Sequence, residues 1–135
     1  MSRAVDIRCY CHGLGDCILV KLHDEEADSA FWMLFDCGIH SAAKGGADVV
    51  RTIVEDIKTT TGGVIDVVVG THEHWDHLSG FTQAREIFAG IEIREVWFSW
   101  AENPKDPDAR KLDRYKGDAA AALPARPSGC RRSRD

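Results

Sequence analysis

The sequence lacks a long apolar run. No stretch of its 135 residues approaches the roughly 20 apolar residues that a membrane-spanning helix needs. The amino end, MSRAVDIRCY, is broken by charges where a secretory signal would be apolar. These absences favour a cytoplasmic protein with no membrane partner. With 44% hydrophobic and 29% charged residues, the chain has the composition of one soluble globular domain.

Paired cysteines and a basic surface are also missing. The five cysteines are an odd number without the spacing of a disulfide-rich scaffold, which favours reduced thiols. In the segment CYCHGLGDC, Cys9 and Cys11 would share one strand face with Ile7, so we expect them to pack as small apolar side chains. A Cys/His metal tract is the alternative for this segment. The net charge of −5 leaves the body of the chain without a basic patch for nucleic acid.

Apolar periodicity predicts a β-rich amino end followed by alternating helices and strands, which makes an α/β protein. Short apolar or alternating runs predict strands at 6–11, 17–22, 31–36, 64–69 and 93–100. Helical spacing predicts helices at 47–60 and 80–90, and a last helix capped by Asp106 with Pro107 at its first position. The strand at 64–69 is apolar enough to be buried on both faces.

The composition changes abruptly after Leu123. The last segment, PARPSGCRRSRD, holds four arginines and two prolines and no repeating apolar position. We therefore expect a folded unit at residues 1–123 and a disordered, arginine-rich tail at 124–135. A frameshift or a premature end would explain the tail.

The decapeptide THEHWDHLSG, residues 71–80, crowds metal-preferring side chains directly after the apolar run VIDVVV. It leaves the carboxyl end of a predicted strand, where open α/β sheets tend to hold ligands. Two histidines spaced by one residue and two donors in the following turn can converge on one point, and imidazoles with a carboxylate suit zinc. The predicted metal ligands are His72, His74, Asp76 and His77. Glu73 and Trp75 alternate with them and should face away.

These residues resemble a known family. HEHWDH matches the H-x-H-x-D-H signature of the metallo-β-lactamase superfamily, and GLGDCILVKL followed by FWMLFDCG is similar to that family's amino-terminal strands. The G-x-G-D form looks most like the hydrolase domain of ComEC/Rec2-type DNA-uptake proteins. The resemblance implies the αββα sandwich of that family, of which this chain would be the amino-terminal half.

The resemblance also implies a reaction, the hydrolysis of an ester, phosphodiester or amide by a metal-activated water. His72 and His74 would hold one zinc ion, and Asp76 and His77 a second, with Mn²⁺ or Fe²⁺ as alternatives. Asp76 would be catalytic by orienting the water. Asp36 resembles the family's first-motif aspartate and would fix a histidine by a hydrogen bond; a loop cap is its alternative role.

The family's later ligands are a histidine, an aspartate and a further histidine, and this sequence has no histidine after His77. Two function classes follow: a truncated hydrolase that binds metal weakly alone, or a catalytically inactive metal-binding or interaction remnant. Half a sandwich would expose apolar sheet, so we expect self-association or a complementing chain. The substrate stays unknown. His12, His23 and His40 are expected at the surface, with His12 or His40 at the pocket rim.

Overall fold

The computed structural model describes residues 4–24 and 29–122, so the predicted tail at 124–135 lies outside the described residues. The described part is a five-stranded sheet with helices, which confirms the α/β class. In chain order the elements are β1 (Val5–Cys9), β2 (Ile18–Asp24), β3 (Ser29–Phe35), α1 (Gly46–Thr60), β4 (Val64–Gly70), α2 (Trp75–Gln83), α3 (Arg85–Phe88), β5 (Glu92–Phe98), the 3₁₀ turn η1 (Trp100–Glu102) and α4 (Pro107–Ala122).

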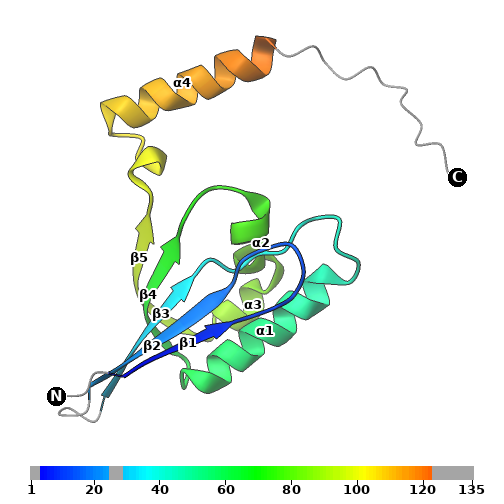
Figure 1. Ribbon diagram of the computed structural model, residues 1–135, viewed down its shortest axis with the longest axis vertical. Helices are drawn as coiled ribbons and strands as arrows, with labels where there is room; N and C mark the ends of the chain where they lie inside the picture. The colour runs from blue at the N-terminus through cyan, green and yellow to red at the C-terminus, as the bar shows by residue number, and fades with distance from the viewer. Residues whose placement is uncertain (1–3, 25–28, 123–135) are drawn as a thin grey trace, which may run out of the picture.

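The strands follow their chain order across the sheet, β1-β2-β3-β4-β5 (Figure 1). The pairs β1–β2 and β2–β3 are antiparallel, because short connections join them. The pairs β3–β4 and β4–β5 are parallel, because α1 and then α2 with α3 carry the chain back. The carboxyl ends of β3, β4 and β5 therefore lie along the same edge of the sheet.

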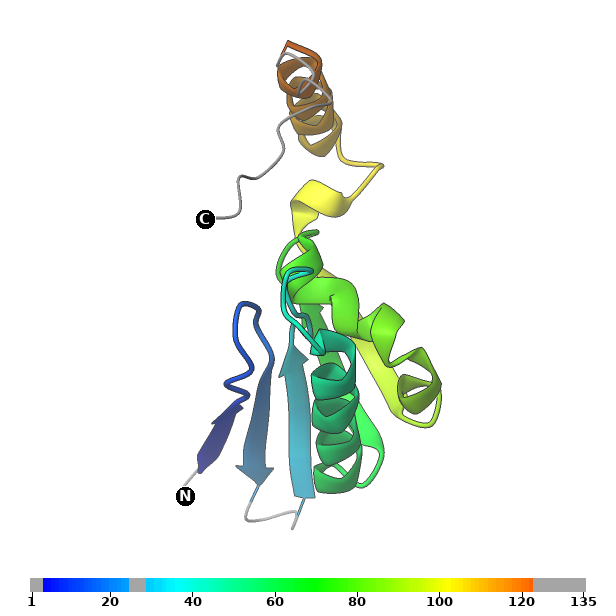
Figure 2. The ribbon, with the colours of Figure 1, turned by 90° about the vertical axis from the view of Figure 1, so that its right-hand side faces the viewer.

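Helices α1, α2 and α3 lie on one side of the sheet (Figure 2). The side chains of α1 that face the sheet are those predicted from helical spacing, and Val50, Ile53, Val54 and Ile57 are all buried. They pack in one core with Leu19 and Leu34, which are paired neighbours on β2 and β3. Among the helices of the described residues, none is long and apolar enough to cross a bilayer.

The helix predicted at 80–90 begins earlier and is interrupted. It starts at Trp75, because the extended His74 leaves its carbonyl free to accept from the N–H groups of His77 and Leu78. Ala84, at φ −116 and ψ 31, separates α2 from α3. Asp76 and His77 consequently sit in the first turn of a helix.

Two sequence-based predictions, the cap of α4 and the packing of Cys9 and Cys11, have opposite outcomes. The expected cap of α4 is present, since Asp106 Oδ1 accepts from the N–H groups of Asp108 at 2.8 Å and Ala109 at 3.1 Å. The expected packing of Cys9 and Cys11 is wrong, because both are exposed. Strand β1 is the edge of the sheet, so alternation there does not imply burial.

Backbone packs directly on backbone beside the start of α2. A Cβ built on Gly38 would lie 2.5 Å from the carbonyl of Asp76 and 2.6 Å from the carbonyl carbon of His77. Gly15 and Gly80 are equally confined, against the carbonyls of Gly38 and Cys37. The segments after β1 and β3 can therefore approach α2 only because these positions carry no side chain.

We expect Gly38→Ala to lower the free energy of unfolding by about 1–3 kcal/mol, because the added methyl overlaps backbone that cannot move independently. Thermal and urea unfolding would measure the loss. Gly117→Ala is the matched control, since nothing lies within 4 Å of its Cβ position on α4. Equal stability of the two variants would contradict the close approach.

Candidate metal centre

The candidate site lies where the parallel strands β3 and β4 end side by side. Phe35 of β3 pairs with Val69 of β4, and the N–H of Asp36 continues this ladder by donating to Val69 O at 2.9 Å. Asp36 thus follows one strand while Thr71 and His72 follow the other. The first turn of α2 then brings His77 back towards the same edge.

The carboxylate of Asp36 joins these segments. It is only 3% exposed, and its oxygens accept from the Thr71 N–H at 2.8 Å, the Thr71 hydroxyl at 2.6 Å and His77 Nδ1 at 2.9 Å. The backbone of Asp36 has a φ of 53°, a left-handed conformation that costs free energy in a residue other than glycine. The three hydrogen bonds offset both this strain and the burial of the charge.

Donor and acceptor chemistry assigns the two histidine tautomers. A carboxylate only accepts, so Nδ1 of His77 carries the proton that it shares with Asp36. The Thr71 hydroxyl donates its one hydrogen to Asp36. In its 3.0 Å contact with His72 Nδ1 the hydroxyl must therefore accept, so Nδ1 of His72 is the donor. With the proton on Nδ1, the neutral form of each imidazole keeps its electron pair on Nε2.

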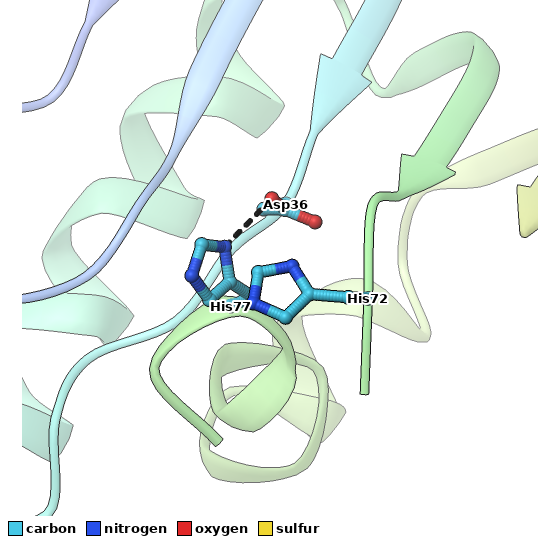
Figure 3. Close-up of side chains that lie close together, drawn as sticks. All are labelled: Asp36, His72 and His77. Atoms are coloured by element: carbon cyan, nitrogen blue, oxygen red, sulfur yellow. Dashed lines mark hydrogen bonds and ion pairs between the residues drawn. The ribbon is translucent and has the colours of Figure 1, made fainter. Parts of the chain in front are cut away.

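The rings of His72 and His77 are tilted by 52° to each other, with centroids 3.8 Å apart, and lie below the Asp36 carboxylate in Figure 3. Asp36, His72 and His77 each offer a ligand atom within 4.8 Å of the others. Two ligands of one zinc ion, each about 2.0–2.2 Å away, lie within roughly 4.4 Å of each other. The donor set suits a transition-metal ion, and its spacing of up to 4.8 Å is slightly wider than that limit.

Two predicted ligands stand beside this group instead of in it. The ring of His74 lies edge-on to that of His72, with 4.6 Å between centroids. Asp76 Oδ2 lies 3.9 Å from His77 Nε2, on the side of the ring away from Asp36. The structure gathers all four predicted residues around the start of α2, and the ligand roles of His74 and Asp76 remain predictions.

Asp36 makes the contact that the expected positioning role requires, a hydrogen bond to a histidine. Three of its roughly four acceptor sites go to Thr71 and His77, which favours positioning over direct binding. Asp36 also fits the alternative role of a loop cap, because its carboxylate accepts a hydrogen bond from the backbone N–H of Thr71.

The sequence analysis did not identify two residues that contact the candidate site, Asp16 and Thr71. Asp16, from the quoted G-x-G-D motif, brings Oδ2 to 3.4 Å from His77 Nδ1 and is 59% exposed at its side chain. Its N–H also donates to Asp76 O at 3.2 Å, which ties the loop after β1 to the site. Thr71 had no signal in the sequence beyond its place before His72.

The residues between the predicted ligands turn outward as expected. Trp75 is 52% exposed. Glu73 pairs with Lys116 of α4 at 3.0 Å, and this hydrogen bond lowers the pKa of the Glu73 carboxyl. Neither side chain is part of the group formed by Asp36, His72 and His77.

The remaining histidines differ from one another. His40 is exposed, as expected, and His23 is partly exposed and pairs with Asp6 at 2.7 Å. His12 is partly buried instead, with Nδ1 2.6 Å from Tyr10 O and Nε2 2.7 Å from Gly38 O. It holds the loop after β1 against the segment after β3, so its contacts are to the backbone.

Comparison with known proteins agrees with this arrangement. The model of the metallo-β-lactamase superfamily matches residues 13–128, so the chain belongs to that superfamily. The sheet with its helices on one face is a partial version of that fold. A crystal structure of unliganded yeast PDE1 is similar with a TM-score of 0.35 and 11% identity, over 87% of this chain and 40% of that chain. The chain thus spans less than half of that protein, and no curated protein matches it.

We expect Thr71→Val to weaken zinc binding about 10- to 100-fold, because the variant keeps the side-chain shape but removes the hydroxyl that orients His72 and Asp36. Competition with a chromogenic chelator would measure the affinity. Thr52→Val is the matched control, since the Thr52 hydroxyl donates to Asp48 O within α1, away from the candidate site. Unchanged zinc affinity in Thr71→Val would show that the hydroxyl does not orient a ligand.

Proposed function

We propose that this chain carries the amino-terminal part of a zinc-dependent hydrolase centre, with Mn²⁺ or Fe²⁺ as alternative ions, that cleaves an ester, phosphodiester or amide. Membership of the superfamily supports a metal-dependent hydrolase. One observation carries the proposal: the Asp36–Thr71 network leaves Nε2 of His72 and Nε2 of His77 free on two rings 3.8 Å apart.

In this proposal a bound metal supplies Lewis acidity, which lowers the pKa of a water and polarises the substrate. His72 and His74 would hold one ion and Asp76 and His77 a second, and Asp36 keeps the ring of His77 fixed through Nδ1. Asp76, whose carboxylate lies beyond Nε2 of His77, would orient the attacking water. The preorganised first turn of α2 keeps Asp76 and His77 at a constant separation.

The centre needs more ligands than this chain supplies under the proposal. A catalytic zinc ion has three protein ligands, and a second ion needs a bridging carboxylate. Asp16 is a candidate for an additional carboxylate, because it is exposed beside His77. The other ligands come from residues outside these 135, in the same or another polypeptide.

We expect the purified chain to bind zinc, and His72→Ala and His77→Ala to lower its zinc affinity by at least about tenfold each, because each removes a direct ligand. Isothermal titration and metal analysis would measure this. His23→Ala is the matched control, since His23 lies on β2 and pairs with Asp6. Equal affinity in all variants would remove the metal centre from the proposal.

Hydrolysis is tested separately, with chromogenic phosphodiester, lactam and thioester substrates and added Zn²⁺, Mn²⁺ or Fe²⁺. We expect slow metal-dependent turnover that His77→Ala and Asp76→Asn reduce about 100-fold or more, because they remove metal binding and water orientation. Zinc binding without any turnover would favour the alternative, a catalytically inactive metal-binding remnant.

A further inference from the structure

A groove lies on the helix side of the sheet, between the end of α1 and the strands β1, β2 and β3. Its volume of about 430 Å³ is within the roughly 300–1,000 Å³ that small-molecule sites occupy. The residues that line it include Asp6, Arg8, Leu19, Lys21, Trp32 and Thr60. We call this hollow the β1–α1 groove.

The β1–α1 groove is separate from the candidate metal centre. Leu19 belongs to the core under α1. It pairs with Arg8 in the strand register, and Lys21, two residues on, pairs with Trp32, so these side chains share the face on which the helices pack (Figure 2). Trp32 lies about 13 Å before Asp36 along the extended chain. The second half of an αββα sandwich would cover the opposite face of the sheet.

Trp32 and Lys21 form an aromatic and cationic wall of this groove. Trp32 is half-buried and packs against the core. The Nζ atom of Lys21 lies over the Trp32 ring, 5.4 Å from its centroid. The long Lys21 side chain can leave this position without breaking a hydrogen bond to another residue of the described ranges. A flat ring could then stack on the indole, with the ammonium beside it.

Arg8 supplies further hydrogen-bond donors. Its Nη1 donates to Asp56 Oδ2 at 2.7 Å and to Thr60 Oγ1 at 3.0 Å, which ties the half-exposed guanidinium to α1. The phenol of Tyr10 donates to the same Asp56 oxygen at 2.6 Å. A guanidinium has five N–H donors, so the Nε and Nη2 groups of Arg8 can still donate to a ligand.

The lining of the groove is more cationic than the rest of the chain. It holds two cations and one carboxylate, whereas the whole chain has a net charge of −5. That carboxylate, Asp6, is already paired with His23 Nε2 at 2.7 Å. Asp56 contacts Arg8 from α1 and is not one of the lining residues. An aromatic wall between two cations with donors to spare suits a flat, negatively charged ligand.

We propose that the β1–α1 groove binds a small aromatic anion, that is, an aromatic ring that carries a carboxylate or phosphate group. The ring stacks on Trp32 in the place of the Lys21 ammonium. The anionic group accepts hydrogen bonds from Lys21 and from Nε and Nη2 of Arg8, which form the parallel pair that a carboxylate or a phosphate accepts. This second site does not depend on the proposed hydrolase function.

The test is an NMR titration of the 135-residue chain, with a chelator present so that metal ions play no part. Benzoate and phenyl phosphate are the probes, one for each anionic group. Benzyl alcohol lacks the charge and inorganic phosphate lacks the ring. We expect at least one probe to bind about tenfold or more tightly than both of these half-ligands, because neither half-ligand makes both contacts. The probe that binds identifies the anionic group.

The indole N–H signals locate the bound probe. The signal of Trp32, assigned with Trp32→Phe, should shift in a saturable way and by more than the signals of Trp75, Trp97 and Trp100. No saturable shift of the Trp32 signal with either probe would overturn the proposal. Binding of benzyl alcohol or inorganic phosphate as tight as that of the probes would overturn it as well.

Variants of the two cations test the contacts to the anionic group. Arg8→Gln and Lys21→Gln should each weaken probe binding about three- to tenfold, because each removes a charge-assisted hydrogen bond. Arg51→Gln is the matched control, since Arg51 lies on α1 and pairs with Glu86 at 3.1 Å, outside the groove. Equal probe affinity in all three variants would contradict the proposed contacts.

A variant that gains affinity separates ligand binding from loss of structure. Asp56→Asn should strengthen probe binding about twofold or more, because it removes a negative charge that competes with the anion for Arg8. The amide oxygen of the variant can still accept from Tyr10, as the carboxylate does. Weaker probe binding by Asp56→Asn, with an unchanged circular dichroism spectrum, would overturn the role of Arg8 as the donor to the anion.

Discussion

The buried carboxylate of Asp36 is the interaction on which the rest of the site depends. It sits in the left-handed conformation between β3 and the segment leading to α1, and it accepts from both the backbone and the side chain of Thr71. Through Nδ1 of His77 it also fixes the first turn of α2. One side chain thus sets the relative positions of three segments, and its own burial is tolerated only while Thr71 and His77 donate to it.

Close packing behind the site supports the same geometry. Cys17 and Cys37 fill the space beneath it; both are buried, and the hydrogen bond between the two thiols, together with burial, raises the pKa of Cys17. Neutral, buried thiols of this kind are unreactive and pack as apolar groups. Ser79 completes the layer by exchanging hydrogen bonds with the backbone of Ile39, at 2.9 and 3.2 Å.

Much of the fold was predictable because the spacing of apolar residues along a strand or helix follows which of its side chains are buried. The strands at 17–22, 31–36 and 64–69 and the helix at 47–60 were found within one or two residues, since each alternates or repeats with its own period. The break between α2 and α3 was not predictable, because Ala84 carries no local signal for it. The exposure of Cys9 could not be read either, since an edge strand looks like an inner strand in sequence.

The site was predictable in place but not in detail. The spacing of histidines after a strand predicted a site at the end of β4, and the structure brings Asp36, His72 and His77 together there as a candidate centre. The part played by Thr71 and Asp16 depends on which loops pack together, 35 and more residues apart in sequence. Such contacts depend on the tertiary fold, so they cannot be predicted from a local sequence pattern.

The order of elements along the chain has a consequence for how the centre forms during synthesis. Every segment that shapes it, from the loop holding Asp16 to the first turn of α2, precedes Gly80, and the strands between them pair with their neighbours in chain order. The ribosome synthesises these segments before β5 and α4. All the residues of this chain that would hold an ion under the proposed function are therefore synthesised before β5 and α4.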